Sequence, residues 1–187
     1  MDIPQYVRTA LVAAKDLIID LSQLDFDNIV ADTEEIQKYI PQRYEMAQIT
    51  AVVYENTDDN ICVGYKDVTP EEFWVRGHMP GLPLMPGVIM CEAAAQLSSF
   101  HVQKHNRMET EMLGFGGLDE VRFRGAVIPG DRLVIALQTV RIRPRRMSIC
   151  RFQGFVGDSM VVEGKIIGIP LPVDVLKAEI AKRKGEQ

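Results

Sequence analysis

The stretch from Arg76 to Phe100, RGHMPGLPLMPGVIMCEAAAQLSSF, decides how the rest of the chain is organised. Its first half is a loop rich in glycine and proline. Because Met85 precedes a proline, helical geometry is disfavoured there, so we expect a helix to begin at Pro86. The apolar residues that follow cover nearly every face of that helix up to about residue 104, a pattern typical of a helix buried in a core.

Strands are predicted on both sides of this helix, because short runs rich in β-branched and aromatic residues are separated by turn residues. Upstream, a polar turn at 55–60 separates Val52–Tyr54 from Ile61–Val68 and predicts a hairpin. Downstream, short turns separate further runs, which favours an antiparallel meander of 118–123, 132–143, 148–156 and 160–169. We therefore expect an α+β fold, in which a curled antiparallel sheet of roughly five to seven strands surrounds one buried helix.

The two ends of the chain carry further helical signals. Apolar side chains recur at helical spacing, or a helix start signal is present, in three segments: 4–21, 33–39 and 173–184. The second of these segments begins directly after Asp32, and Asp32 and Glu35 have the spacing of a capping box. We expect an N-terminal helical extension at 1–32 and one main domain at 33–187.

The composition narrows the class of protein. The chain has 187 residues, of which 47% are hydrophobic and 25% charged, enough to form one buried core. A net charge of −5 counts against a general nucleic-acid binder, because phosphate contacts favour a basic surface. No window approaches the roughly 20 apolar residues of a membrane span, and the N-terminus lacks the pattern of a signal peptide. Cys62, Cys91 and Cys150 are far apart and suit free thiols in a reducing compartment, so we expect a cytoplasmic protein.

We predict no metal site. His101 and His105 are four residues apart on the predicted helix, a spacing that can bind a metal ion, but the sequence shows no third ligand beside them. Exposed histidines near the C-terminal end of a helix are the favoured interpretation, because positive side chains complement the helix dipole there.

The predicted helix start and its loop carry groups suited to proton transfer next to a carbonyl. The first amides of the helix, at Gly87 and Val88, lack helical partners, and such amides can bind an oxyanion. Glu92 lies among apolar neighbours beside Gln96, which favours a carboxyl group held in a pocket over one on a solvated face. His78 is fixed by its loop and can act as a base near neutral pH, although a histidine that only stabilises the loop is the alternative. A base, an acid and an oxyanion site together describe proton abstraction beside a carbonyl.

At these residues the sequence resembles a known family. GHMPGLPLMPGVIMCEAAAQ, at 77–96, is similar to the active-site motif of the FabZ-type 3-hydroxyacyl-acyl-carrier-protein dehydratases, roughly GHFPGxPxMPGVLxxEAxAQ. His78 and Glu92 keep the fourteen-residue separation of that motif. The resemblance extends over about 33–170 and includes the family's RFR and VxPGD elements, at Val121–Arg124 and Val127–Asp131. The sequence departs from the family pattern at Gln42, in the segment Glu45–Ala47 and at Leu82.

The resemblance implies a hotdog fold, in which a curled antiparallel sheet wraps a central helix. It implies that His78 removes the C2 proton of a 3-hydroxyacyl thioester, that Glu92 protonates the departing C3 hydroxyl group, and that the Gly87 N–H binds the thioester oxygen. It also implies that the substrate site includes Met85, Pro86, Val88 and Gln96. The acyl group would arrive on the phosphopantetheine of acyl carrier protein, and no other cofactor and no metal would be needed.

The resemblance further implies partners. The catalytic side chains of this family meet across a dimer interface, so we expect a homodimer as the minimal unit, with a trimer of dimers as the larger alternative. A basic cluster on an otherwise acidic protein is the expected docking site for the acidic carrier protein, with a solvated hairpin turn as the alternative interpretation. The members of this cluster are Arg141, Arg143, Arg145 and Arg146.

Two other functions stay open from the sequence. One is a hotdog thioesterase or hydratase that acts on other acyl thioesters. The other is a non-catalytic acyl-binding hotdog subunit. The presence of both His78 and Glu92 favours an enzyme, because a binding module needs neither a base nor an acid at that spacing.

Overall fold

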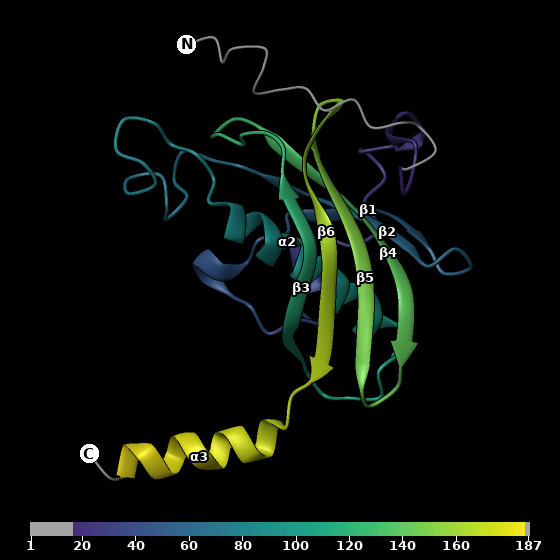
Figure 1. Ribbon diagram of the computed structural model, residues 1–187, viewed down its shortest axis with the longest axis vertical. Helices are drawn as coiled ribbons and strands as arrows, with labels where there is room; N and C mark the ends of the chain where they lie inside the picture. Colours follow the sequence, from purple (N-terminus) through teal and green to yellow (C-terminus); the bar gives the residue numbers. More distant parts are fainter. Residues whose placement is uncertain (1–16, 186–187) are drawn as a thin grey trace.

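One antiparallel sheet curls around helix α2 (Gly87–Lys104) in the computed structural model, which describes residues 17–185 (Figure 1). The sheet has six strands in the order β1-β2-β4-β5-β6-β3. Their bounds are β1 Ala51–Asn56, β2 Ile61–Asp67, β3 Leu113–Phe123, β4 Arg132–Arg143, β5 Met147–Val156 and β6 Ser159–Pro170. The predicted α+β architecture, with one helix inside a curled antiparallel sheet, is therefore confirmed.

Helix α2 is buried because its apolar residues leave no polar face. Ala93, Ala94, Leu97 and Phe100 have no exposed surface, and the helix contacts β2, β3, β4, β5 and β6. The predicted helix start is one residue early, since Pro86 has an extended ψ of 133° and caps a helix that begins at Gly87. Proline is well placed there because it has no N–H to leave unpaired.

The prediction was wrong about how β3 begins and pairs. The strand begins at Leu113 rather than at residue 118, and it pairs with β6, so only β4, β5 and β6 form a meander. The predicted strand left out Gly114, Gly116 and Gly117, which belong to β3. Gly116 is needed inside the strand, because a Cβ there would lie 2.7 Å from the Ile169 side chain. The β3–β6 pairing is irregular at two places, between Phe115 and Gly117 and between Asp119 and Arg122.

The segment that precedes the sheet packs on the face opposite α2. Ile18 is buried in a second apolar cluster with residues of β1, β2, β4 and β5, and its N–H donates to Oε1 of Gln153 at 2.9 Å. This cover explains why five consecutive residues of β4, Leu133–Leu137, are all buried. Along that run, alternate side chains point to α2 and to the N-terminal segment.

Most of the predicted helix at 4–21 falls on residues 1–16, which lie outside the described residues. Its last part is not helical at 17–20, and a single 3-10 turn follows at Leu21–Gln23. The division of the chain at residue 32 stays a prediction, although residues on both sides of it pack on the same sheet.

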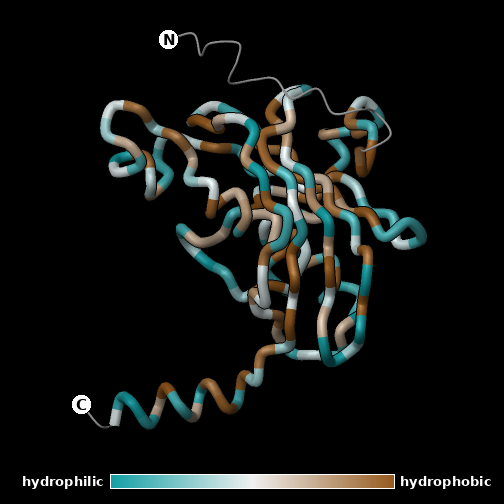
Figure 2. The backbone as a smooth tube through the Cα atoms, viewed as in Figure 1, coloured by the Kyte–Doolittle hydropathy of each residue, from teal (hydrophilic) through white to brown (hydrophobic). Residues whose placement is uncertain are grey.

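The smaller helices agree with the sequence signals. The predicted helix start is confirmed, because the Asp32 side chain accepts a hydrogen bond from the Glu35 N–H at 2.8 Å and caps α1 (Thr33–Ile36), although the Glu35 side chain bonds to Lys38 and does not complete a capping box. Helix α3 (Val173–Gly185) follows β6 and extends away from the sheet (Figure 1), with hydrophobic and hydrophilic positions interleaved along it (Figure 2). Within residues 17–185, no helix has the length and apolar character needed to cross a bilayer.

The two edges of the sheet differ. The β1 edge is partly covered, because the Val52 N–H donates to the Ala31 carbonyl oxygen at 2.8 Å. No strand of the described chain lies beyond β3, and this edge exposes three large apolar side chains: Phe115 at 47%, Leu118 at 41% and Phe123 at 54%. An open apolar edge of this kind is suited to pairing with another chain.

Candidate active site

The N-terminal end of α2 presents two backbone donors. Within residues 17–185, the N–H groups of Gly87 and Val88 have no backbone partner, whereas the Ile89 N–H already bonds to the Pro86 carbonyl oxygen. The preceding residue is anchored, because the Met85 N–H donates to the Val127 carbonyl oxygen at 2.8 Å and its side chain is buried. The side chain of Val88 is exposed. This helix end is therefore fixed in position and open to a ligand, as an oxyanion site requires.

Gly87 leaves room for an aromatic ring beside the helix start. A Cβ at this position would lie 2.6 Å from the ring of Phe123 at the end of β3, so any larger residue requires this half-exposed ring to move. Phe123 belongs to the RFR element, and nothing in the sequence placed it beside the predicted oxyanion site.

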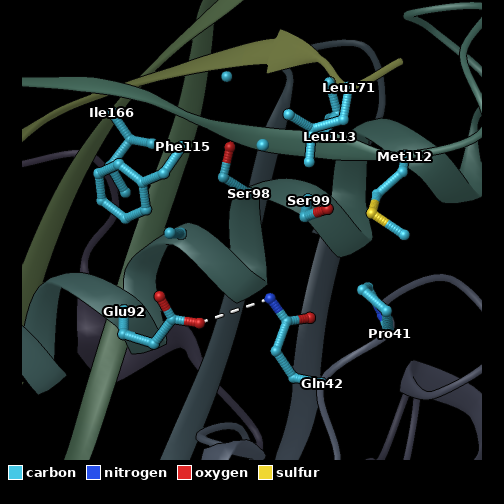
Figure 3. Close-up of a pocket in the computed structure, with 13 residues that line it drawn as sticks. Pro41, Gln42, Glu92, Ser98, Ser99, Met112, Leu113, Phe115, Ile166 and Leu171 are labelled. Carbon is cyan, nitrogen blue, oxygen red and sulfur yellow. Dashed lines mark hydrogen bonds between the residues drawn. The ribbon is translucent and has the colours of Figure 1, made fainter. Parts of the chain in front are cut away.

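Glu92 lines a pocket between α2, β3 and β6, as expected for a carboxyl group in an apolar setting (Figure 3). Its Oε1 accepts a hydrogen bond from Nε2 of Gln96 at 2.7 Å. Nε2 of Gln42 lies further away, at 3.5 Å. The pocket is lined by Pro41, Gln42, Glu92, Ala95, Ser98, Ser99, Met112, Leu113, Gly114, Phe115, Ile166, Gly168 and Leu171.

Gln96 holds the carboxyl group in one position because its own amide is fixed on both sides. Its Nε2 also donates to the Met46 carbonyl oxygen at 2.6 Å, and its Oε1 accepts from the Gln48 N–H at 2.8 Å. The predicted contact between Gln96 and Glu92 is thus confirmed. Among the described residues, Oε2 of Glu92 accepts no hydrogen bond, so this oxygen remains available to a substrate hydroxyl group.

His78 lies in a loop that is held by hydrogen bonds between its own backbone groups. The His78 N–H donates to the Trp74 carbonyl oxygen at 2.7 Å, and the Leu84 N–H returns to the His78 carbonyl oxygen at 2.9 Å. Nδ1 of the imidazole lies 2.8 Å from the Leu84 carbonyl oxygen. A carbonyl oxygen only accepts, so Nδ1 carries the proton and Nε2 keeps the lone pair that a general base needs. The imidazole is exposed.

One chain does not bring the predicted base and acid together. His78 is absent from the walls of the Glu92 pocket, as are Gly87, Val88 and Gln96. The pocket has a volume of about 220 Å³, which is below the roughly 300–1,000 Å³ of most complete small-molecule sites. The structure therefore shows two partial sites. One is the N-terminal end of α2, and the other is the Glu92 pocket further along the same helix.

The four arginines are exposed at the β4–β5 hairpin, as predicted for a surface cluster: Arg141, Arg143, Arg145 and Arg146. In Figure 1 this hairpin lies at the end of the sheet away from the 76–86 loop. It lies at the same end as the Glu92 pocket, because Ser148 pairs with Gly168, which pairs with Phe115. Arg145 also forms an exposed ion pair with Glu109 at 2.8 Å.

Several pocket residues carried no signal in the sequence. Met112, Phe115 and Leu171 come from the start of β3 and the end of β6. Only the β3–β6 pairing, which the predicted meander did not include, brings them beside Glu92. Gln42 was noticed only as a departure from a family pattern, and the structure gives it a place in the pocket wall (Figure 3).

Comparison with known proteins agrees with this arrangement. Residues 40–165 match the FabA-like domain, so the chain belongs to the FabA-like family. The fold is similar to that of the dehydratase heterocomplex ApeI:P from Xenorhabdus doucetiae, with a TM-score of 0.63 and 15% identity over 76% of this chain and 95% of that one. It is also similar to Cj0977, a sigma28-regulated virulence protein from Campylobacter jejuni, with a TM-score of 0.58 and 14% identity over 80% of this chain and 94% of that one. At such identities the two similarities establish a shared fold.

Proposed function

We propose that this protein is a FabZ-type dehydratase that converts 3-hydroxyacyl-acyl-carrier-protein thioesters into trans-2-enoyl thioesters. The observation that carries the proposal is Glu92, a lone carboxyl group held by Gln96 in a mostly apolar pocket, with one oxygen unpaired among the described residues. This carboxyl group lies on the same helix as the open N–H groups of Gly87 and Val88, which belong to the other partial site. Membership of the FabA-like family and the structural similarity to a dehydratase heterocomplex support this class of reaction.

Each group has a distinct task in the proposed reaction. Nε2 of His78 takes the C2 proton, and the electron pair of that C–H bond forms the C2=C3 double bond. The C3–O bond breaks as Glu92 protonates the leaving hydroxyl group, which departs as water. The Gly87 N–H binds the thioester oxygen and stabilises the negative charge that develops on it. The acyl group is carried by phosphopantetheine, and this chemistry needs neither a metal ion nor a nucleotide.

A second copy of the chain would complete the site. When identical edge strands pair antiparallel about a two-fold axis, the start of each strand lies beside the end of its mate. In this chain the Glu92 pocket lies at the start of β3, and Gly87 lies against Phe123 at its end. Pairing through β3 would therefore bring the open helix start of one copy towards the Glu92 pocket of the other. It would also cover the exposed side chains of Phe115 and Leu118.

Acyl carrier protein is the proposed macromolecular partner. The β4–β5 hairpin provides exposed arginines. Strand β5 is separated from β3 by β6 alone, and its start lies at the same end of the sheet as the start of β3 and the pocket. An acidic carrier would be steered to this end by complementary charge. We further propose a cytoplasmic location, which is supported by three free and buried cysteines.

The proposal is tested with mixed dimers, in which each of the two chains carries a different inactivating substitution. His78→Ala and Glu92→Gln chains with different tags are co-expressed, and the mixed dimers are purified through both tags in sequence. Each single-variant protein is expected to be inactive, whereas the mixed dimer has one site with both native groups and should recover about half of the wild-type rate of enoyl formation. The rate is followed by enoyl absorbance with 3-hydroxyacyl thioesters of several chain lengths.

The alternatives give different outcomes. No enoyl product from wild-type protein at any chain length would leave the non-catalytic subunit as the better reading. Release of free thiol without enoyl formation would indicate a thioesterase. Recovery that fails in the mixed dimer, with wild-type protein active, would show that each site is built within one chain.

A further inference from the structure

The C-terminal end of α2 carries a cluster of side chains that the proposed dehydration does not use. Its centre is Glu55 at the end of β1, whose Oε1 lies 2.9 Å from Nδ1 of His101 and 2.8 Å from Nε2 of His105. Oε2 of the same carboxylate accepts a hydrogen bond from Lys104 at 2.7 Å. His101 is fully buried and the Glu55 side chain is 9% exposed, so the prediction of exposed histidines was wrong for His101.

A thiol completes this cluster. Cys62 is the cross-strand partner of Glu55 in the β1–β2 pair, so both side chains point to the same face of the sheet, towards α2. Single ligand atoms of Glu55, Cys62 and His101 all lie within 4.8 Å of one another. Cys62 is fully buried, and burial raises the pKa of its thiol well above the usual value.

The hydrogen bonds of His101 leave one nitrogen without a partner. Its Nδ1 faces the Glu55 carboxylate and carries a proton. Its Nε2 is buried and has no partner among the described residues. Nδ1 is therefore the nitrogen that faces the cluster. When the proton of a neutral imidazole moves from Nδ1 to Nε2, Nδ1 offers its lone pair to an ion beside Glu55.

We propose that Glu55, Cys62 and His101 bind one divalent transition-metal ion of the zinc class, because their ligand atoms all lie within 4.8 Å of one another. One imidazole, one carboxylate and one thiolate form a mixed donor set that suits Zn²⁺. His105, whose Nε2 lies 2.8 Å from Oε1 of Glu55, would supply a fourth ligand by a turn of its side chain. A thiol binds a metal ion as the thiolate, so binding releases the proton of Cys62.

Lys104 bonds to the Glu55 carboxylate, and its positive charge would oppose a cation here. It binds Oε2 rather than Oε1, and its side chain is 23% exposed, so it can move into solvent while Oε1 binds the ion. The ion would tie the last turn of α2 to β1 and β2, and its burial favours a structural role over a catalytic one. This inference is independent of the proposed dehydratase activity.

The test uses full-length protein freed of any histidine tag and stripped with a chelator. Co²⁺ is added as a spectroscopic probe, and Zn²⁺ is then added in competition. We expect one Co²⁺ per chain, tetrahedral d–d bands in the visible, and a thiolate-to-cobalt charge-transfer band in the near ultraviolet, all removed by one equivalent of Zn²⁺. No saturable binding at micromolar Co²⁺ would overturn the proposal and leave Glu55 as the centre of an ion-pair cluster only.

Matched variants separate this site from other thiols and from adventitious binding. Cys62→Ser should abolish the charge-transfer band, whereas Cys150→Ser should retain it, because Cys150 is also buried but is paired with Ser98 and Thr139. Lys104→Met should bind Co²⁺ about tenfold more tightly, since a nearby positive charge is removed. A band that survives Cys62→Ser, or affinity that falls in Lys104→Met, would contradict the proposed ligand set.

Discussion

The two ends of α2 differ in whether the polar groups beside them have hydrogen-bond partners. At the N-terminal end, the N–H groups of Gly87 and Val88 and one oxygen of Glu92 have no partner within residues 17–185. At the C-terminal end, both oxygens of Glu55 are bonded by side chains of the same helix. A polar group without a partner on a rigid element is available to a substrate or a second chain, whereas a group that is hydrogen-bonded within the chain contributes to stability. We call the N-terminal end of α2 the open end and the C-terminal end the closed end.

This difference predicts how variants divide. Changes at the open end should lower the catalytic rate and leave the free energy of unfolding nearly unchanged. Changes at the closed end should do the reverse. The following variants test that division, from the largest expected effect to the smallest.

Glu92→Gln should lower kcat for dehydration by about a thousandfold, because the amide keeps the size of the carboxyl group but cannot supply a proton. Its melting temperature should stay within about 2 °C of wild type, since the amide oxygen can still accept from Gln96. Steady-state kinetics and thermal melting, measured on the same preparation, check both parts. A rate close to that of wild type would remove Glu92 from the mechanism.

Glu55→Gln should lower the free energy of unfolding by about 3 kcal/mol, because it leaves the Lys104 ammonium group facing a neutral amide in a mostly buried site. The measurement is urea unfolding in the presence of a chelator, which separates the ion pairs from any bound metal. The kcat of the folded variant should match that of wild type. A large loss of kcat without loss of stability would break the proposed contrast between the two ends.

Gly87→Ala should lower kcat by about a hundredfold, because alanine keeps the backbone N–H but its methyl group and the displaced Phe123 ring obstruct access to it, an effect comparable with the loss of an oxyanion donor. The added methyl group meets the Phe123 ring at 2.6 Å, and the ring must move into the space beside the helix start. Because Phe123 is half exposed, this movement should cost little stability. Phe123→Ala is the control: if it restores the rate of Gly87→Ala, the loss came from the displaced ring and not from the methyl group itself.

Replacement of both Arg145 and Arg146 by glutamate should raise KM for carrier-bound substrate about tenfold through weaker docking. The rate with a free pantetheine thioester should not change, since neither arginine lines the pocket. The Arg145 N–H bonds to the Met108 carbonyl oxygen, a backbone contact that does not depend on the arginine side chain. Equal losses with both substrates would indicate a structural role for the hairpin.

Local patterns in the sequence predicted most of the elements, because local chemistry determines them. The apolar run after Pro86 predicted a buried helix, and Asp32 predicted the cap of α1. The β3–β6 pairing was not predictable in this way, since it joins residues that are distant in the sequence, from Leu113 with Pro170 to Phe123 with Val162, and passes through several glycines.

The candidate site was predictable only where its residues are close in the sequence. Gln96 and Glu92 are one turn apart on α2, so their hydrogen bond followed from helical spacing. The partners of His101 did not, because Glu55 lies 46 residues upstream and reaches the histidine only when β1 has entered the sheet. Sequence spacing therefore identified the histidine pair at the end of α2 but not the groups that bury it.

The irregular pairing of β3 has a consequence for self-association. An open apolar strand with a regular ladder could add copies without limit and form fibres. The two register shifts, between Phe115 and Gly117 and between Asp119 and Arg122, interrupt that ladder. In the proposed dimer both copies carry the same two breaks, so a mate related by a two-fold axis would match them, and no free edge would remain at β3 for a third copy.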